Sequence, residues 1–175
     1  MADHAPTVSP PSGPAPGPSD PRRAALDDPR LTAAGLLFEV STGLAAQLTG
    51  QISAAGISMS EFEVLLRLSR SEATRLRMSD LATQANLSSS GLTRLVDRLE
   101  ARGLVRRQAC PSDGRGSFAV LTDDGLEALL DVLPGHVELI DRWYTSTLSP
   151  TQLDQITAAL RTVRAVVRPG AEAGA

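Results

Sequence analysis

The sequence predicts a mainly α-helical (α+β) chain in which long helices flank a module of short capped helices and one β-hairpin. Three observations lead to this fold class. Apolar residues recur at spacings of three and four over most of the chain, which is typical of amphipathic helices. Helix-capping residues and glycines delimit these stretches. One segment alternates instead around a glycine-rich turn, which is typical of a β-hairpin.

Composition limits the class of protein before any motif is considered. The 175 residues suit one domain with a tail, and 42% are hydrophobic, which is enough to build a core. The chain has no uninterrupted run of about 18 apolar residues and no basic, apolar start typical of a secretory signal. The single Cys110 cannot form an internal disulfide. We therefore expect a cytoplasmic protein with no membrane partner.

Residues 1–27 are predicted to form a disordered, proline-rich tail. Eight of the 12 prolines fall within residues 1–30, and seven of them sit among Gly, Ser and Ala. Such a segment cannot bury enough apolar surface to offset the entropy that it would lose on ordering. A proline-rich docking motif is the functional alternative for this tail.

The first long helix is predicted to begin at Asp28 and Pro29, which suit the N-cap and first helical positions, and to end near Gly56. Its apolar face is rich in Ala, which favours close packing against other helices. We expect residues 28–57, together with residues 123–168, to form a helical dimerisation region. The stripe comprises Leu37, Ser41, Leu44, Leu48 and Ile52.

A module of short helices follows over residues 58–122. Ser58 and Glu61 form a capping box, and residues 75–77 are extended. Ser79 is predicted to cap a brief helix over residues 80–85. Ser88 caps the next helix, which Gly103 ends. The expected buried residues are Phe62, Leu65, Leu66, Leu81, Leu92, Leu95, Val96 and Leu99.

The hairpin and the last two helices complete the pattern. Residues 104–109 and 117–121 are predicted strands, joined by a turn over residues 111–116. Thr122 caps a long helix that the Pro134–Gly135 pair should kink. Ser149, Pro150 and Gln152 begin the final helix, and residues 169–175 are expected to be a flexible C-terminus.

Two capped helices joined by a short turn form a helix-turn-helix, and a hairpin directly after it forms a wing. The order of these elements therefore predicts a winged helix-turn-helix module. The long helices on either side carry apolar stripes that one small domain cannot cover. Their expected partner is a second copy of the chain, which gives a homodimer.

Residues 88–105 (SSSGLTRLVDRLEARGLV) and 113–122 (DGRGSFAVLT) together resemble the recognition helix and wing of the MarR family of bacterial transcription regulators. Residues 107–113 (RQACPSD) are similar to the SlyA-type branch. Ala119 departs from the Val usual at that strand position. This resemblance implies a dimeric winged helix-turn-helix protein whose recognition helix enters the major groove and whose wing reaches the minor groove. It also implies release from DNA by a small, often aromatic, ligand.

The predicted DNA contacts lie on the recognition helix and the wing. By resemblance Thr93, Arg94 and Arg98 contact DNA, and an Arg can bind a guanine edge with two hydrogen bonds. Asp97 is expected to orient Arg94 or Arg98, because phosphate repels it. The full set of predicted DNA-binding residues is Ser88, Ser89, Ser90, Thr93, Arg94, Arg98, Asp113 and Arg115.

Five of these residues, the three serines and the two wing residues, are also supported by physical reasons that do not depend on the resemblance. Ser88, Ser89 and Ser90 lie at a helix N-terminus, where hydroxyls and free N–H groups favour phosphate. Arg115 suits the negative potential of a narrow minor groove, and Asp113 suits a role in holding the wing loop. The competing interpretation of all these residues is a helix cap, a solvated polar face and a polar turn.

Charge is distributed unevenly along the chain. All 17 basic residues are Arg, and the formal net charge is −3. Residues 60–122 hold ten Arg against seven acidic residues, which gives +3, while the remainder holds seven against thirteen, which gives −6. The module predicted to bind DNA is therefore basic within an acidic chain, and its binding should depend on salt.

The expected function is a sequence-specific DNA-binding regulator, a repressor released from a pseudo-palindromic double-stranded operator by a small-molecule effector. Phe38 and Phe62 are weak candidates for the ligand site, although both suit a core position. No residue pattern indicates catalysis, a cofactor or a metal site. The alternatives are a winged-helix dimer that binds proteins, and a redox-responsive regulator acting through Cys110.

Overall fold

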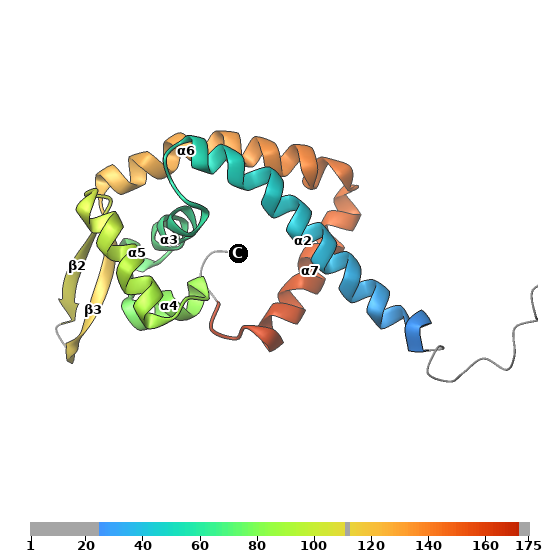
Figure 1. Ribbon diagram of the computed structural model, residues 1–175, viewed down its shortest axis with the longest axis horizontal. Helices are drawn as coiled ribbons and strands as arrows, with labels where there is room; N and C mark the ends of the chain where they lie inside the picture. The colour runs from blue at the N-terminus through green and yellow to red at the C-terminus, as the bar shows by residue number, and fades with distance from the viewer. Residues whose placement is uncertain (1–24, 111–112, 172–175) are drawn as a thin grey trace, which may run out of the picture. The chain divides into compact units, whose positions relative to one another are not determined.

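The computed structural model describes residues 25–110 and 113–171, with the backbone alone at residues 113–115 (Figure 1). Most of the predicted proline-rich tail, residues 1–24, lies outside the described residues. Residues 25–27 form a single 3-10 turn, η1 (Ala25–Asp27). The chain divides into two compact units inside the first long helix, residues up to Ser41 and residues from Thr42 onward.

Long helices precede and follow a module with a three-stranded sheet along the chain, so the predicted mainly α-helical (α+β) fold is confirmed. The elements in chain order are α2 (Pro29–Ala54), α3 (Met59–Ser69), η2 (Glu72–Thr74), β1 (Arg75–Arg77), α4 (Met78–Ala85), α5 (Ser89–Ala101), β2 (Val105–Cys110), β3 (Asp113–Leu121), α6 (Asp123–Trp143), η3 (Thr145–Thr147) and α7 (Pro150–Val167).

Most of the predicted helix caps are confirmed by hydrogen bonds. Ser58 and Glu61 form a reciprocal capping box at α3, as do Ser149 and Gln152 at α7. Ser88 caps α5 through the Gly91 amide. Helix α6 runs through Pro134 as one helix.

The predicted N-terminus of α4 was wrong by two residues. This helix begins at Met78 with Arg77 in the N-cap position, and no side chain caps it. The Ser79 hydroxyl instead donates to the neighbouring Asp80 carboxylate at 3.0 Å. Strand β1 leads directly into the helix, so the extended backbone of Arg77 already supplies the cap geometry.

Strand β3 forms the centre of an antiparallel sheet with the order β1-β3-β2. It begins at Asp113, so the turn predicted over residues 111–116 is shorter than expected. The backbone pairs across the hairpin as far as Cys110 and Asp113, with an irregularity between Ala109 and Cys110. Pairing therefore extends into a glycine-containing stretch that residue type alone assigned to the turn.

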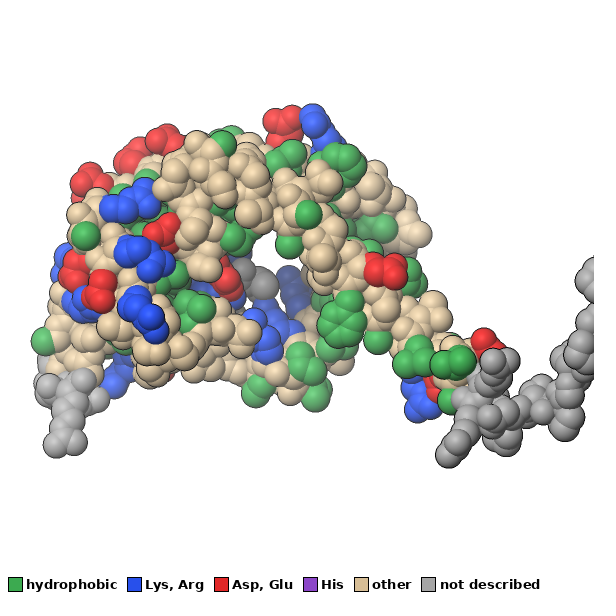
Figure 2. Space-filling view, in the orientation of Figure 1, with side chains coloured by type: hydrophobic (Ala, Val, Ile, Leu, Met, Phe, Trp, Pro, Cys, Tyr) green, Lys and Arg blue, Asp and Glu red, His purple; other side chains and the backbone are tan. Residues whose placement is uncertain are grey.

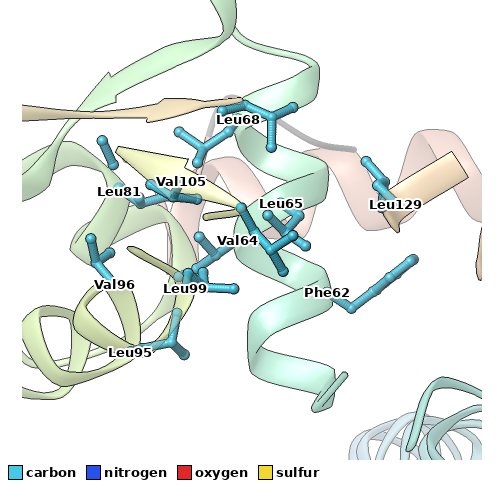
Figure 3. Close-up of a cluster of buried hydrophobic side chains, with 14 of the residues drawn as sticks. Phe62, Val64, Leu65, Leu68, Leu81, Leu95, Val96, Leu99, Val105 and Leu129 are labelled. Atoms are coloured by element: carbon cyan, nitrogen blue, oxygen red, sulfur yellow. The ribbon is translucent and has the colours of Figure 1, made fainter. Parts of the chain in front are cut away.

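The core lies where α3, α4, α5 and the inner face of the sheet meet (Figure 3). Helix α3 is central, because its side chains reach α4 and α5 on one side and α6 on the other. Full burial of an aliphatic side chain contributes about 1.5–3 kcal/mol. The residues that are no more than 3% exposed include Phe62, Val64, Leu65, Leu68, Leu81, Leu92, Leu95, Val96, Leu99, Val105 and Leu129.

The end of the recognition helix is joined closely to the start of α6. Thr122 accepts a hydrogen bond from the Gly125 amide at 3.0 Å, and its hydroxyl donates to the Gly103 carbonyl at 2.7 Å. Gly103 has a φ of +74°, which favours glycine. A Cβ atom on Gly125 would lie 2.0 Å from the Leu104 carbonyl oxygen, so only glycine allows this approach.

The apolar stripes of the long helices are largely uncovered within one chain. Leu130 and Val137 on α6 are 46% and 53% exposed, although Leu129 and Val132 of the same helix are buried. None of the residues of α7 is buried. The predicted dimerisation region over residues 28–57 and 123–168 stays a prediction.

Helix α2 is long and apolar enough, by length and composition, to cross a membrane. An 18-residue window within it has a mean hydropathy of 1.3, although polar residues interrupt every apolar run. Within the first unit, Leu31, Leu36, Leu37, Phe38 and Val40 are all exposed.

The end of the chain departs from the expected flexible C-terminus over part of its length. Residues 169–171 follow α7 as a turn, and Ala171 is buried at 6% exposure. Residues 172–175 lie outside the described residues. The described part of the C-terminus is therefore packed against the rest of its unit.

Candidate DNA-binding surface

Helix α5 presents one apolar and one polar face. Leu92, Leu95, Val96 and Leu99 face the core, while all of the predicted contact residues on this helix are exposed. Figure 2 shows several Arg side chains gathered over the face that carries α4 and α5. The sequence therefore places a polar surface on the outside of a helix that the core holds from beneath.

The N-terminus of α5 carries the three serines. Ser88 accepts from the Gly91 amide at 3.1 Å, and its hydroxyl lies 3.3 Å from that of Ser90. A Cβ atom on Gly91 would lie 3.1 Å from the Ser88 oxygen, so glycine leaves room for the cap. Ser88 thus has a structural role as a cap, while Ser89 and Ser90 are exposed at the positive end of the helix dipole.

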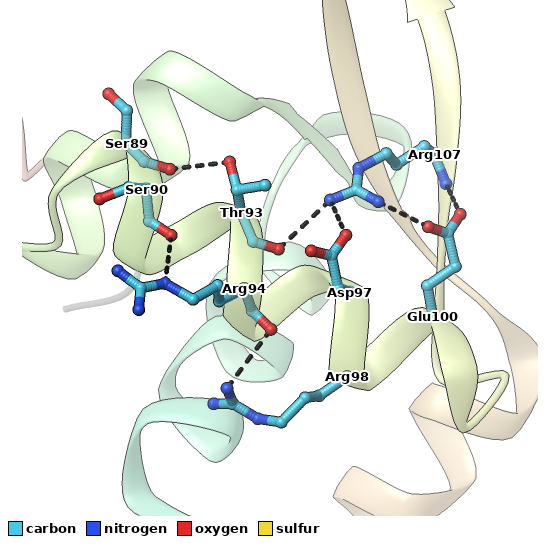
Figure 4. A network of polar contacts seen from close by, with 8 residues as sticks. All are labelled: Ser89, Ser90, Thr93, Arg94, Asp97, Arg98, Glu100 and Arg107. Atoms are coloured by element: carbon cyan, nitrogen blue, oxygen red, sulfur yellow. Dashed lines mark hydrogen bonds and ion pairs between the residues drawn. The ribbon is translucent and has the colours of Figure 1, made fainter.

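Thr93, Arg94 and Arg98 follow along the exposed face (Figure 4). The Thr93 hydroxyl donates to the Ser89 carbonyl at 2.8 Å, and Arg94 Nε donates to the Ser90 carbonyl at 3.3 Å. Arg98 Nη1 donates to the Arg94 carbonyl at 3.3 Å. These local bonds align the side chains along the helix and leave other guanidinium N–H groups of Arg94 pointing outward.

Asp97 does not orient Arg94 or Arg98, so this expectation was wrong. Its carboxylate forms an ion pair of 2.7 Å with Nη2 of Arg107, which lies on strand β2 (Figure 4). Arg107 also donates from Nη1 to Glu100 at 2.8 Å, from its backbone amide to Glu100 at 2.9 Å, and from Nη2 to the Thr93 carbonyl at 3.3 Å. This single side chain therefore joins the recognition helix to the wing.

Sequence reasoning missed Arg107, although a signal was present. Residues alternate along β2, and Val105 faces the core. Arg107 lies two residues further on and therefore shares that inner side. A charged residue on an inward side needs a partner, and the acidic residues of the preceding helix are the nearest in sequence.

Glu61 supports α5 from the beginning of α3. Its carboxylate accepts from the Ser58 amide at 2.9 Å and lies 3.7 Å from Arg98 Nε and 3.8 Å from Arg102 Nη1. Burial alone would raise the pKa of Glu61, but the hydrogen bonds from Ser58 and the charges of Arg102 and Arg98 lower it overall. Arg98 therefore faces a buried carboxylate as well as solvent.

The wing positions Asp113 and Arg115 at the start of β3, where the structure describes only the backbone. The predicted roles of these two side chains at the wing stay predictions. Their backbone belongs to the sheet that Arg107 ties to α5. Cys110, at the end of β2, is buried at 5% exposure.

A second group of cations lies on β1, outside the predicted set. The guanidinium carbons of Arg75 and Arg77 lie 5.0 and 5.6 Å from the centre of the Phe118 ring. Strand pairing places Arg77 opposite Phe118, so these side chains share the outer face of the sheet. Arg75, Arg77 and Phe118 line an open pocket of about 340 Å³. Glu72 and Asp80 line it too, and their carboxylates reduce its positive charge.

The two weak ligand candidates have different surroundings. Phe38 is 69% exposed in the first unit, whereas Phe62 is buried and its ring centre lies 4.6 Å from that of His136. Burial lowers the pKa of His136. Among the described residues, three buried side-chain polar atoms have no hydrogen-bond partner, namely Gln51 Oε1 on α2, His136 Nδ1 on α6 and Gln84 Oε1 on α4.

Comparison with known proteins agrees with this geometry. The model of the MarR family matches residues 57–117, which span the helix-turn-helix and the wing. The chain is also 30% identical over 127 residues to the transcriptional repressor MprA of Escherichia coli K12, covering 71% of this chain and 72% of that protein.

The chain belongs to the MarR family.

Two solved structures extend the comparison. Sco3205 of Streptomyces coelicolor, a MarR-family regulator solved in complex with DNA, is 37% identical with a TM-score of 0.74, covering 85% of this chain and 93% of that one. CouR of Rhodococcus jostii RHA1, solved bound to p-coumaroyl-CoA, is 25% identical with a TM-score of 0.65, covering 73% and 88%. This MarR-family chain is therefore a DNA-binding transcriptional regulator.

Proposed function

We propose that this MarR-family protein is a homodimeric repressor that reads a pseudo-palindromic operator with α5 in the major groove and the wing in the minor groove. The observation that carries this proposal is the exposed face of Ser89, Ser90, Thr93, Arg94 and Arg98, held in place by Arg107 and Glu61. Preorganised donors lose little freedom on binding DNA. The similarity to MprA, a repressor, and to Sco3205, solved with DNA, supports the same function.

A gel-shift experiment tests this function. The probes are the duplex upstream of the protein's own gene and a scrambled duplex of equal length and composition. We expect the upstream duplex to bind at least about a thousandfold more tightly, within the range usual for specific regulators. Equal affinity for both duplexes, or no binding at low salt, would reject a sequence-specific regulator and favour a protein-interaction module.

We propose that the dimer covers the exposed apolar faces of α6 and α7. Ile156, Leu160 and Val163 are 36%, 40% and 50% exposed, at the spacing of a helix-packing seam. Light scattering on the full chain should give twice the monomer mass. The double variant Leu160→Glu, Val163→Glu should give a mass closer to that of one chain. A monomeric wild-type protein at micromolar concentration would contradict this assembly.

We also propose a small-molecule effector bound near Phe62. The His136 ring lies beside that of Phe62, and His136 Nδ1 and the acceptor Gln51 Oε1 are both unpartnered, which suits an aromatic ligand with a polar substituent. The similarity to CouR makes p-coumaroyl-CoA and free p-coumarate reasonable first probes. An effector should raise the melting temperature and release the duplex, and Gln51→Leu should reduce both responses.

Redox control through Cys110 receives less support from the structure. Its side chain is buried, and a redox-sensing thiol needs access to the oxidant. Cys110→Ser should therefore bind DNA as the wild type does, before and after treatment with hydrogen peroxide. We further propose that the protein acts in the cytoplasm, where its DNA is found.

A further inference from the structure

The C-terminal end of α7 contacts the first helix of the helix-turn-helix. Arg168, which directly follows α7, donates from Nη2 to the Thr83 carbonyl at 3.2 Å and to the Gln84 carbonyl at 2.8 Å. Both carbonyls belong to the last turn of α4, where helix carbonyls lack the N–H donors of a further turn, and the Thr83 carbonyl also accepts from the Asn86 amide at 3.3 Å. Residues 168–171 are called the C-terminal strap below.

Two further contacts hold the strap without the guanidinium group. Ala171 is buried, and its amide donates to the Arg168 carbonyl at 3.0 Å to close a turn. A Cβ atom on Gly170 would lie 2.7 Å from Cγ2 of Thr83, so the strap backbone packs directly on α4. The Arg168 bonds and the Gly170 approach therefore both place the strap on the last turn of α4.

The strap contacts α4 shortly before the recognition helix begins, so it bears on DNA recognition. Helix α4 has eight residues, too few to be stable alone, and a cation at its C-terminus complements the helix dipole. Asn86 follows at once with a φ of +56°, and Ser88 then caps the recognition helix. The strap thus holds the piece of chain that sets where α5 begins.

We propose that the strap couples α7 to the helix-turn-helix, with Arg168 as a positioning residue that fixes the orientation of the recognition helix in the dimer. This inference rests on the proposed dimeric DNA-binding function. Two recognition helices in a dimer must match two half-sites in separation and rotation. A strap that restrains each helix makes binding sensitive to the spacing between the half-sites.

Amide hydrogen exchange of the DNA-free, full-length protein tests the contact itself. The amides of Asn86 and Leu87 donate to Thr83 and Ala82, next to the strap. Arg168→Ala should speed their exchange about tenfold, Gly170→Val should do the same by steric displacement, and Arg168→Lys should restore part of the protection. Arg161→Ala removes a similar charge from an exposed position on α7 and should change nothing. Unchanged exchange in both strap variants would overturn the proposal.

Operator spacing tests the positioning role. A duplex selected by the wild-type protein from a random pool is compared with versions carrying one or two base pairs inserted between the half-sites. Each inserted base pair rotates one half-site relative to the other by about 35°. We expect the wild type to lose at least a hundredfold in affinity per insertion, and Arg168→Ala to lose tenfold or less, while Arg161→Ala behaves as the wild type.

The two proposals fail in different ways in this experiment. A steep and identical spacing penalty in wild type and Arg168→Ala would overturn the strap and leave the DNA-binding function standing. Failure of the wild type to select any duplex would overturn the proposed function and the positioning role together. Light scattering and thermal unfolding of each variant establish that the dimer and the fold are intact.

Discussion

The guanidinium group of Arg107 on β2 forms a 2.7 Å ion pair with the carboxylate of Asp97 on α5. The same group reaches Glu100, so one side chain of the wing holds two residues of the recognition helix. The side chain of Arg107 is only 30% exposed, which limits screening by solvent. Arg107 therefore ties the recognition helix to strand β2 of the wing, and Asp97 is paired with a cation on the exposed side of α5.

Arg107→Ala should weaken operator binding about tenfold, because α5 and the wing then move independently and lose entropy on binding. The adjacent Arg106→Ala is the matched control, since Arg106 is exposed and carries the same charge. Fluorescence anisotropy on a labelled operator measures both. Equal losses in the two variants would mean that only net charge matters and would reject the clamp.

Arg94→Ala should lower affinity for the cognate operator by about 1–3 kcal/mol, or 5- to 150-fold, and relax the preference for one base. Arg94→Lys keeps the charge but lacks the rigid planar fork, so it should restore salt-dependent affinity and only part of the base preference. Titrations against operators substituted at each position provide the measurement. Full base preference in either variant would show that α5 docks in another orientation.

Glu61→Gln should destabilise the fold at neutral pH and make little difference in acid. The pKa of Glu61 is lowered in the folded chain, so its ionised form contributes stability above the ordinary value of 4.5. That contribution is lost as the pH falls below 4.5 through the lowered folded pKa. Thermal unfolding of both proteins from pH 7 to pH 3 measures it, and a difference that stays constant with pH would contradict this account.

Gly125→Ala should destabilise the fold by about 3 kcal/mol or more, because the new methyl group would meet the Leu104 carbonyl. Gly43→Ala is the matched control on α2, where a Cβ atom meets nothing within 4 Å. That change should be neutral or mildly stabilising. Chemical denaturation separates the two, and equal stability of both variants would contradict the close approach.

The sequence was sufficient for the features that depend on local chemistry. The capping boxes at Ser58 and Ser149, the left-handed Gly103 and the hairpin all follow from residue type and spacing, and the structure confirms them. Local patterns also identified the polar face of α5 as the exposed one.

Long-range partners were beyond local patterns, for physical reasons. Asp97 pairs with Arg107 and not with Arg94, because the register of β2 brings Arg107 next to the helix. That register depends on the whole sheet. The contact of Arg168 with Thr83 joins residues 85 positions apart. The cap of α4 was misassigned to Ser79 because the preceding strand, not a side chain, sets the helix start.

The hydrogen bond from Thr122 to the Gly103 carbonyl joins the start of helix α6 to the end of the recognition helix, so a movement of α6 also moves the recognition helix. Helix α6 has 21 residues and is therefore about 30 Å long. A tilt of about 6° about one end of a rod of that length moves the other end by roughly 3 Å, close to the rise of one base pair. A tilt of α6 about its far end, too small to disturb the core there, would thus shift the recognition helix by about one base pair along the DNA.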